Sequence, residues 1–133
     1  MKPILVSVVL AIAVFTGCTN TRITEDNGVA LDYTMVDREQ TPSELMSIIT
    51  ERKTEEFSIT YSLEGYLYIA VGYGAKSTGG YSIAVKELCE TDNSIVIDTE
   101  LIGPKSGEPV NKMESYPYAI VKLEYRDKTV IFK

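Results

Sequence analysis

The side chains that could carry out chemistry in this chain are few, because the sequence has no His and only two Cys. Without His there is no Ser-His or Cys-His pair and no His-ligated metal site. Lys76, Ser77, Ser82 and Lys86 could supply a Ser-Lys dyad, but they lie in an open polar segment that would not desolvate a lysine. The sequence therefore predicts that this protein is not an enzyme.

Cys18 ends a segment typical of secretion. Lys2 gives a positively charged start, and residues 4–15 form an apolar run shorter than the about 20 residues that span a bilayer. Phe15-Thr16-Gly17-Cys18 resembles a bacterial lipobox, with Phe where the pattern usually has Leu. We expect residues 1–17 to be a lipoprotein signal peptide. Cys18 is expected to be acylated, with palmitate as one acyl group, and to anchor the protein in the bacterial cell envelope, facing away from the cytoplasm. An ordinary secretory peptide followed by a chance Cys is the alternative.

Several other kinds of site are excluded by charge and spacing. The net charge of −6 argues against a nucleic-acid partner. Residues 72–78 resemble a phosphate-binding loop only superficially, because a Gly pair and a strand pattern follow instead of a helix. Asp98 and Glu100 share one face of a strand and are expected to be solvated. Cys89 is left alone once Cys18 is acylated, and it is expected to be buried and unreactive. We predict no cofactor, no metal ion and no small-molecule substrate.

The rest of the chain divides into a tether and one domain. Residues 18–30 are polar and lack a hydrophobic period, which is typical of a flexible tether, and residues 31–133 are enough for a single core. A helix is predicted near Thr41, where Thr41 would be the N-cap and Glu44 would complete a capping box. Leu45, Ile48 and Ile49 follow at helical spacing and predict a packing face.

From Glu56 onward the hydrophobic period changes to that of strands. Turns are predicted at Glu64-Gly65, at Asp92-Asn93 and over residues 126–128. The predicted strands cover residues 33–36, 57–63, 66–71, 81–89, 95–101, 118–125 and 129–132. The fold class is β-rich α+β: an antiparallel sheet or partly open barrel of six to seven strands with one N-terminal helix.

Two segments combine Gly, Pro and Tyr in a way that suits recognition. One is the Gly-rich stretch that ends at Tyr81, and the other is the connection over residues 103–117. Structureless connections of that length are uncommon unless they are functional. Tyr offers contact area with a polar tip at low entropic cost, although it also fills strand positions. Recognition and sheet packing are therefore both open for these tyrosines.

The stretch from Tyr73 to Tyr125 resembles the C-terminal domain of the PrcB family, the protease complex subunit lipoproteins. The resemblance depends on Gly72-Tyr73-Gly74, on Lys76-Ser77-Thr78-Gly79-Gly80-Tyr81-Ser82-Ile83, and on the later Gly107-Glu108-Pro109 and Tyr116-Pro117-Tyr118. It implies a non-catalytic partner of a secreted or surface protease. The Gly pair would allow a bulge or tight turn with positive φ. The residues predicted to contact the partner are Tyr73, Lys76, Thr78, Gly79, Gly80, Tyr81, Pro109, Tyr116, Pro117 and Tyr118.

A second resemblance gives a competing function. Ser77-Thr78-Gly79-Gly80-Tyr81 is similar to the Thr-Gly-Tyr loop of chagasin-type inhibitors of cysteine proteases, with one extra Gly. That family also uses an Arg-Pro-Trp element, and this chain has no Trp. The alternative function that the loop resemblance implies is loop-based protease inhibition.

Overall fold

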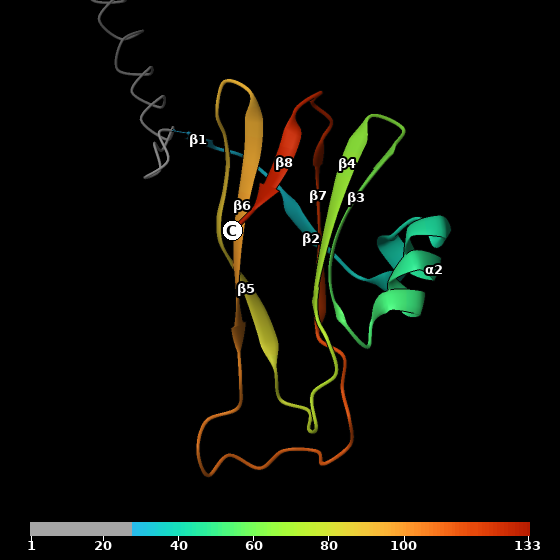
Figure 1. Cartoon of the computed structure of the whole chain (residues 1–133), viewed down its shortest axis with the longest axis vertical. Coiled ribbons are helices and arrows are strands. Elements are labelled where there is room, and N and C mark those ends of the chain that lie inside the picture. Colours follow the sequence, from blue (N-terminus) through green and yellow to red (C-terminus); the bar gives the residue numbers. More distant parts are fainter. Residues whose placement is uncertain (1–27) are drawn as a thin grey trace, which may run out of the picture.

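The computed structural model describes residues 28–133, so the predictions of a signal peptide, of acylated Cys18 and of most of the tether lie outside the described residues. The fold contains one α-helix, one short 3₁₀ helix and eight strands within this range (Figure 1). In chain order they are β1 (Val29–Ala30), β2 (Thr34–Val36), η2 (Arg38–Gln40), α2 (Ser43–Arg52), β3 (Glu56–Leu63), β4 (Tyr66–Tyr73), β5 (Ser82–Glu90), β6 (Ser94–Ile102), β7 (Tyr118–Glu124) and β8 (Thr129–Phe132).

The strands form two four-stranded sheets, ordered β1-β5-β6-β8 and β2-β7-β4-β3. The β-rich prediction is confirmed, but the sheets do not close into a barrel, and the strands number eight rather than six to seven. The additional strand is β1, at the end of the predicted tether. Its two residues pair with Glu90 and Cys89 of β5, and a strand so short leaves no alternation in the sequence.

The prediction of an all-antiparallel sheet is wrong for the last strand, β8. After the turn at residues 126–128, β8 does not return beside β7 but joins the other sheet, where it pairs with β6 in parallel. The remaining pairings are antiparallel. The chain thus crosses between the sheets after β7, and the first sheet is mixed.

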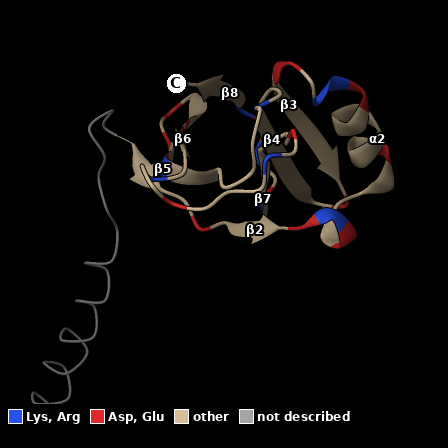
Figure 2. Ribbon diagram, turned by 90° about the horizontal axis from the view of Figure 1, so that it is seen from below, with Lys and Arg blue, Asp and Glu red and all other residues tan. Residues whose placement is uncertain are grey.

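One core fills the space between the two sheets. Leu67, Ile69 and Val121 from one sheet meet Leu88 and Ile97 from the other. A second core lies on the outer side of the β2-β7-β4-β3 sheet, where α2 covers it (Figure 2). That sheet is therefore apolar on both faces, which explains why β4 is almost continuously buried.

The helix is confirmed, but its predicted N-terminal capping is wrong. Pro42 rather than Thr41 is the N-cap, and no side chain caps the helix. The Thr41 hydroxyl instead donates to the Asp37 carbonyl over 2.7 Å, and the Tyr61 hydroxyl donates to the Glu44 carboxylate. Asp37 and Gln40 form a capping box on the preceding η2. A proline N-cap has no side-chain oxygen to offer, so the helix depends on the burial of Leu45, Met46 and Ile49.

The hairpin turns predicted by sequence are present. Glu64 and Gly65, both with positive φ, connect β3 to β4, as a two-residue hairpin turn requires. Asp92 and Asn93 lie between β5 and β6. These turns gather at one end of the molecule, and the long connections gather at the other (Figure 1).

Candidate functional site

The two segments that the sequence singled out lie side by side at one end of the sandwich. Residues 74–81 join β4 to β5, and residues 103–117 join β6 to β7. Both connections lie at the bottom of Figure 1, in yellow-green and orange. We call residues 74–81 and 103–117 together the two-loop surface.

Hydrogen bonds from the backbone and from one side chain join these two loops. Lys76 and Ser115 form an antiparallel bridge with N–H···O distances of 2.8 and 2.9 Å. The Gly79 amide donates to the Asn111 carbonyl over 2.8 Å. The Ser115 hydroxyl donates to the Thr78 carbonyl over 2.6 Å. The loops therefore form one connected structure, although they are far apart in the sequence.

The backbone at position 80 explains why one residue of the Gly79-Gly80 pair is Gly. Its φ is +92°, a conformation that L side chains rarely adopt, and a Cβ there would lie 3.2 Å from Pro104 Cβ and from Val110 Cγ1. The positive φ predicted for this pair is thus found at Gly80. The adjacent Gly79 instead donates a backbone hydrogen bond to the Asn111 carbonyl.

Three of the predicted contact tyrosines also have internal partners. The hydroxyls of Tyr73 in β4 and Thr99 in β6 lie 2.5 Å apart, which connects the two sheets. The Tyr81 ring packs beside Gly103, whose added Cβ would lie 3.2 Å from Tyr81 Cε2. Tyr118 packs against the core under α2. All three are half-buried, so packing is at least part of their role.

Tyr116 and Pro117 lie at the junction between the loop and β7. The Lys53 ammonium stands 4.6 Å from the centre of the Tyr116 ring, and the Tyr116 hydroxyl donates to Glu114 over 2.7 Å. That hydrogen bond raises the pKa of the Tyr116 hydroxyl above its ordinary value. The Pro117 carbonyl accepts from the Tyr73 amide over 3.0 Å.

Most of the exposed residues of the two-loop surface are in its second loop, although Ala75 and Ser77 of the first loop are exposed too. Pro109 is exposed, as are the charged Lys105, Glu108 and Lys112. Met113 is 69% exposed, the highest fraction among the exposed large apolar side chains in the described chain. Sequence reasoning missed Met113, because one apolar residue inside a polar loop has no periodicity to reveal it. A flexible, polarizable Met exposed in a loop is suited to adaptable protein contacts.

The remaining residues considered for chemistry are not brought together. Cys89 is fully buried, and its thiol donates weakly to Glu87 over 3.7 Å. Glu100 is exposed and Asp98 is partly exposed, on the outer face of their sheet. Within residues 28–133, no group of three or more Cys, Asp or Glu side chains is arranged to hold a metal ion.

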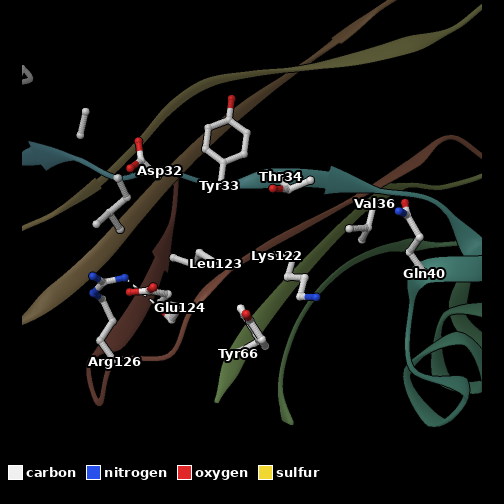
Figure 3. A pocket seen from close by; sticks show the side chains of 12 residues that line it. Asp32, Tyr33, Thr34, Val36, Gln40, Tyr66, Lys122, Leu123, Glu124 and Arg126 are labelled. Atoms are coloured by element: carbon white, nitrogen blue, oxygen red, sulfur yellow. Dashed lines mark hydrogen bonds between the residues drawn. The ribbon is translucent and has the colours of Figure 1, made fainter. Parts of the chain in front are cut away.

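A separate groove of about 540 Å³ lies around the edge strand β2 (Figure 3). Its cationic side chains already have partners. Lys122 stands 4.2 Å from the centre of the Tyr66 ring, and Arg126 pairs with Glu90 at 3.0 Å and donates to the Glu124 carbonyl. The groove is mixed in polarity and holds no convergent set of groups that would select a ligand.

Residues 67–124 match the family model described as PrcB C-terminal. The resemblance stated from sequence is thereby confirmed, and the match extends from β4 to β7, so it contains the whole two-loop surface. The α2 helix, β3 and β8 lie outside the PrcB C-terminal match. No curated protein and no solved structure gave a significant match. No helix in residues 28–133 is long and apolar enough to cross a membrane.

Proposed function

We propose that this chain is a non-catalytic binding subunit of a secreted or surface protease complex, held outside the cytoplasm by lipid on Cys18. The observation that supports this function is that the PrcB C-terminal match contains both loops of the two-loop surface. Within that match, Lys76, Thr78 and Gly79 of the first loop bond to Ser115 and Asn111 of the second. Because these bonds hold the two loops in one shape, the loops offer a defined surface to a protein partner.

The two-loop surface offers a suitable arrangement for a protein partner. Met113 and Pro109 provide exposed apolar area, and Lys105, Glu108 and Lys112 add exposed groups of mixed charge in the same loop. Apolar anchors inside a polar rim are the usual organisation of protein interfaces. Of the half-buried tyrosines, Tyr81 lies against this surface, beside Gly103.

The proposed function is tested by photo-crosslinking in the native membrane. The intact chain carries a photoreactive amino acid in place of Met113, and a matched variant carries it in place of Asn93, an exposed residue in the β5–β6 turn at the opposite end. We expect a protease to be linked at position 113 and not at position 93. No adduct, or equal adducts at both positions, would contradict the proposal.

Inhibition of a cysteine protease is the second candidate. It is favoured by the position of Thr78–Tyr81 in a loop at one end of a two-sheet sandwich, beside a second loop. The chain is mixed at equal concentration with a papain-like protease, and the hydrolysis of a peptide substrate is measured. Stoichiometric loss of hydrolysis would favour inhibition, whereas unchanged hydrolysis would favour the subunit role.

A further inference from the structure

The edge strand β3 is unusually open to pairing. It has eight residues, whereas the other edge strands β1, β2 and β8 have two, three and four. Natural edge strands are normally protected by shortness, Lys, Pro or a bulge. β3 has none of these, and its one charged residue is Glu56 at the start. Among the described strands, only β4 pairs with it.

The hairpin geometry shows which backbone groups of β3 lie on the open side. Because Glu64-Gly65 is a two-residue turn, Leu63 and Tyr66 form a hydrogen-bonded pair, and such pairs recur at every second residue. The amides and carbonyls of Phe57, Ile59 and Tyr61 therefore point toward β4. Those of the intervening residues point outward: Glu56, Ser58, Thr60 and Ser62.

The sequence of β3 is symmetric in chemical type about Ile59. Phe57-Ser58-Ile59-Thr60-Tyr61 has an aromatic residue at each end, a hydroxyl residue on each side and Ile in the middle. A two-fold interface requires this self-complementarity. We propose that β3 pairs antiparallel with β3 of a second copy, about a two-fold axis at Ile59, to make a continuous eight-stranded sheet.

This register places suitable groups opposite each other. Ser58 faces Thr60 of the second copy, so hydroxyl side chains meet, and Glu56 faces Ser62 rather than another charge. On the other face, which packs toward α2, Ile59 meets its own equivalent. The Phe57 ring leans over Gly72 toward its own β4, so Ile59 provides the main apolar contact at the axis.

The hollow beside β3 is lined by the same hydroxyl side chains that a second copy of β3 would present to it. Ser58, Thr60 and Ser62 line a hollow of about 410 Å³ that continues to Val130 and Phe132 of β8. β8 and β3 lie on the same side of the molecule (Figure 2). A second β3 brings short hydroxyl side chains beside this hollow, which matches those already there. Each copy has one such edge, so the pairing closes at a dimer.

The dimer is tested by disulfide trapping of the full chain in its membrane. Directly opposite residues that are not hydrogen-bonded have Cα atoms about 4.5 Å apart, within the range of about 4.4–6.8 Å that a disulfide spans. With copper-phenanthroline as oxidant, Ile59→Cys is expected to form a covalent dimer. Asn93→Cys in the distant turn is the matched control, and the buried Cys89 stays in every variant.

The register gives a sharper result than dimerisation alone. Ser58→Cys and Thr60→Cys are each expected to remain monomeric on oxidation, while their mixture is expected to form a heterodimer. A self-linked Thr60→Cys dimer would move the axis and overturn this register. No dimer at positions 58–60, or a covalent adduct with a different protein there, would overturn the second copy as the occupant.

A second pair of variants changes the open edge itself, with trapping of Ile59→Cys kept as the readout. Thr60→Lys places an ammonium group on the open edge in both copies, and it is expected to lower trapping of Ile59→Cys by about tenfold. Thr60→Ser keeps the hydroxyl and is expected to preserve trapping. The circular dichroism spectrum should be the same for both, and equal trapping in both would contradict the proposed interface.

Discussion

The Ser115 hydroxyl donates a hydrogen bond of 2.6 Å to the Thr78 carbonyl, which fastens the β6–β7 connection to the β4–β5 connection. With the Lys76–Ser115 bridge and the Gly79–Asn111 bond, it joins two loops that are far apart in the sequence. These polar contacts, together with the close approach of Pro104 and Val110 to Gly80, hold residues 103–117 in one shape. Binding through this surface and the stability of these contacts should therefore change together.

Ser115→Ala tests this connection. The change leaves the Thr78 carbonyl without its partner, and we expect a loss of about 1 kcal/mol in the free energy of unfolding. Hydrogen exchange of the Gly79 amide should become faster, because its bond to Asn111 lies in the same network. Ser106→Ala, in an exposed part of the same loop, is the control and should change neither quantity. Unchanged exchange at Gly79 in Ser115→Ala would show that the loops are held by other contacts.

Gly80→Ala should destabilise the domain for two reasons. The residue has a φ of +92°, which costs about 1–2 kcal/mol for an L side chain, and the new Cβ would press on Pro104 and Val110. Gly107→Ala separates the causes, because Gly107 also has positive φ (+82°) but no heavy atom within 4 Å of the added Cβ. Urea unfolding should show a larger loss for Gly80→Ala. Equal losses would mean that backbone strain alone matters.

Tyr73→Phe tests whether the Tyr73 hydroxyl is structural. It lies 2.5 Å from Thr99 Oγ1 and connects the sheets, so we expect a loss of about 1 kcal/mol in unfolding free energy. In a double-mutant cycle with Thr99→Val, the two changes should be non-additive by about 0.5–1.5 kcal/mol. Crosslinking at position 113 should persist, since the hydroxyl points between the sheets. Additive stability effects would refute the connection between the sheets.

The sequence predicted local structure well because its cues are local. The alternation from Phe57 to Leu63 and the Glu64-Gly65 turn define the β3–β4 hairpin without reference to the rest of the chain. The crossing of β8 to pair in parallel with β6 was not predictable in this way, because that choice depends on which sheet has space at its edge. The two residues of β1 are too few to carry a period.

The candidate site shows the same division. The Gly, Pro and Tyr content pointed to the two loops, and the structure brings these loops together. Composition could not separate a tyrosine that faces a partner from one that packs inside, because that depends on contacts such as Tyr73 with Thr99, 26 residues apart. Met113 had no neighbour in the sequence to mark it, and its exposure is a property of the folded loop.

Glu90 predicts how stability depends on pH. Its carboxylate accepts a 2.6 Å hydrogen bond from Lys128 and pairs with Arg126 at 3.0 Å, which joins β5 to the turn that carries the chain into β8. The hydrogen bond from Lys128, followed by the charge of Arg126, holds the pKa of Glu90 below its usual range despite partial desolvation. Because the folded pKa is the lower one, this contribution is present above the unfolded pKa of about 4.3 and is lost as pH falls through the folded value.

Glu90→Gln should therefore cost stability at pH 7 and little at pH 2. The side chains of Glu90, Arg126 and Lys128 are only 23–27% exposed, so their two ion pairs are about three-quarters buried. We therefore expect a loss of about 1 kcal/mol in the free energy of unfolding at neutral pH. Urea unfolding of both proteins from pH 7 to pH 2 measures the difference. Glu100→Gln is the matched control, because Glu100 is exposed on the same sheet and should show no such convergence. A difference between wild type and Glu90→Gln that stays constant down to pH 2 would show that packing, rather than the ion pairs, accounts for the loss.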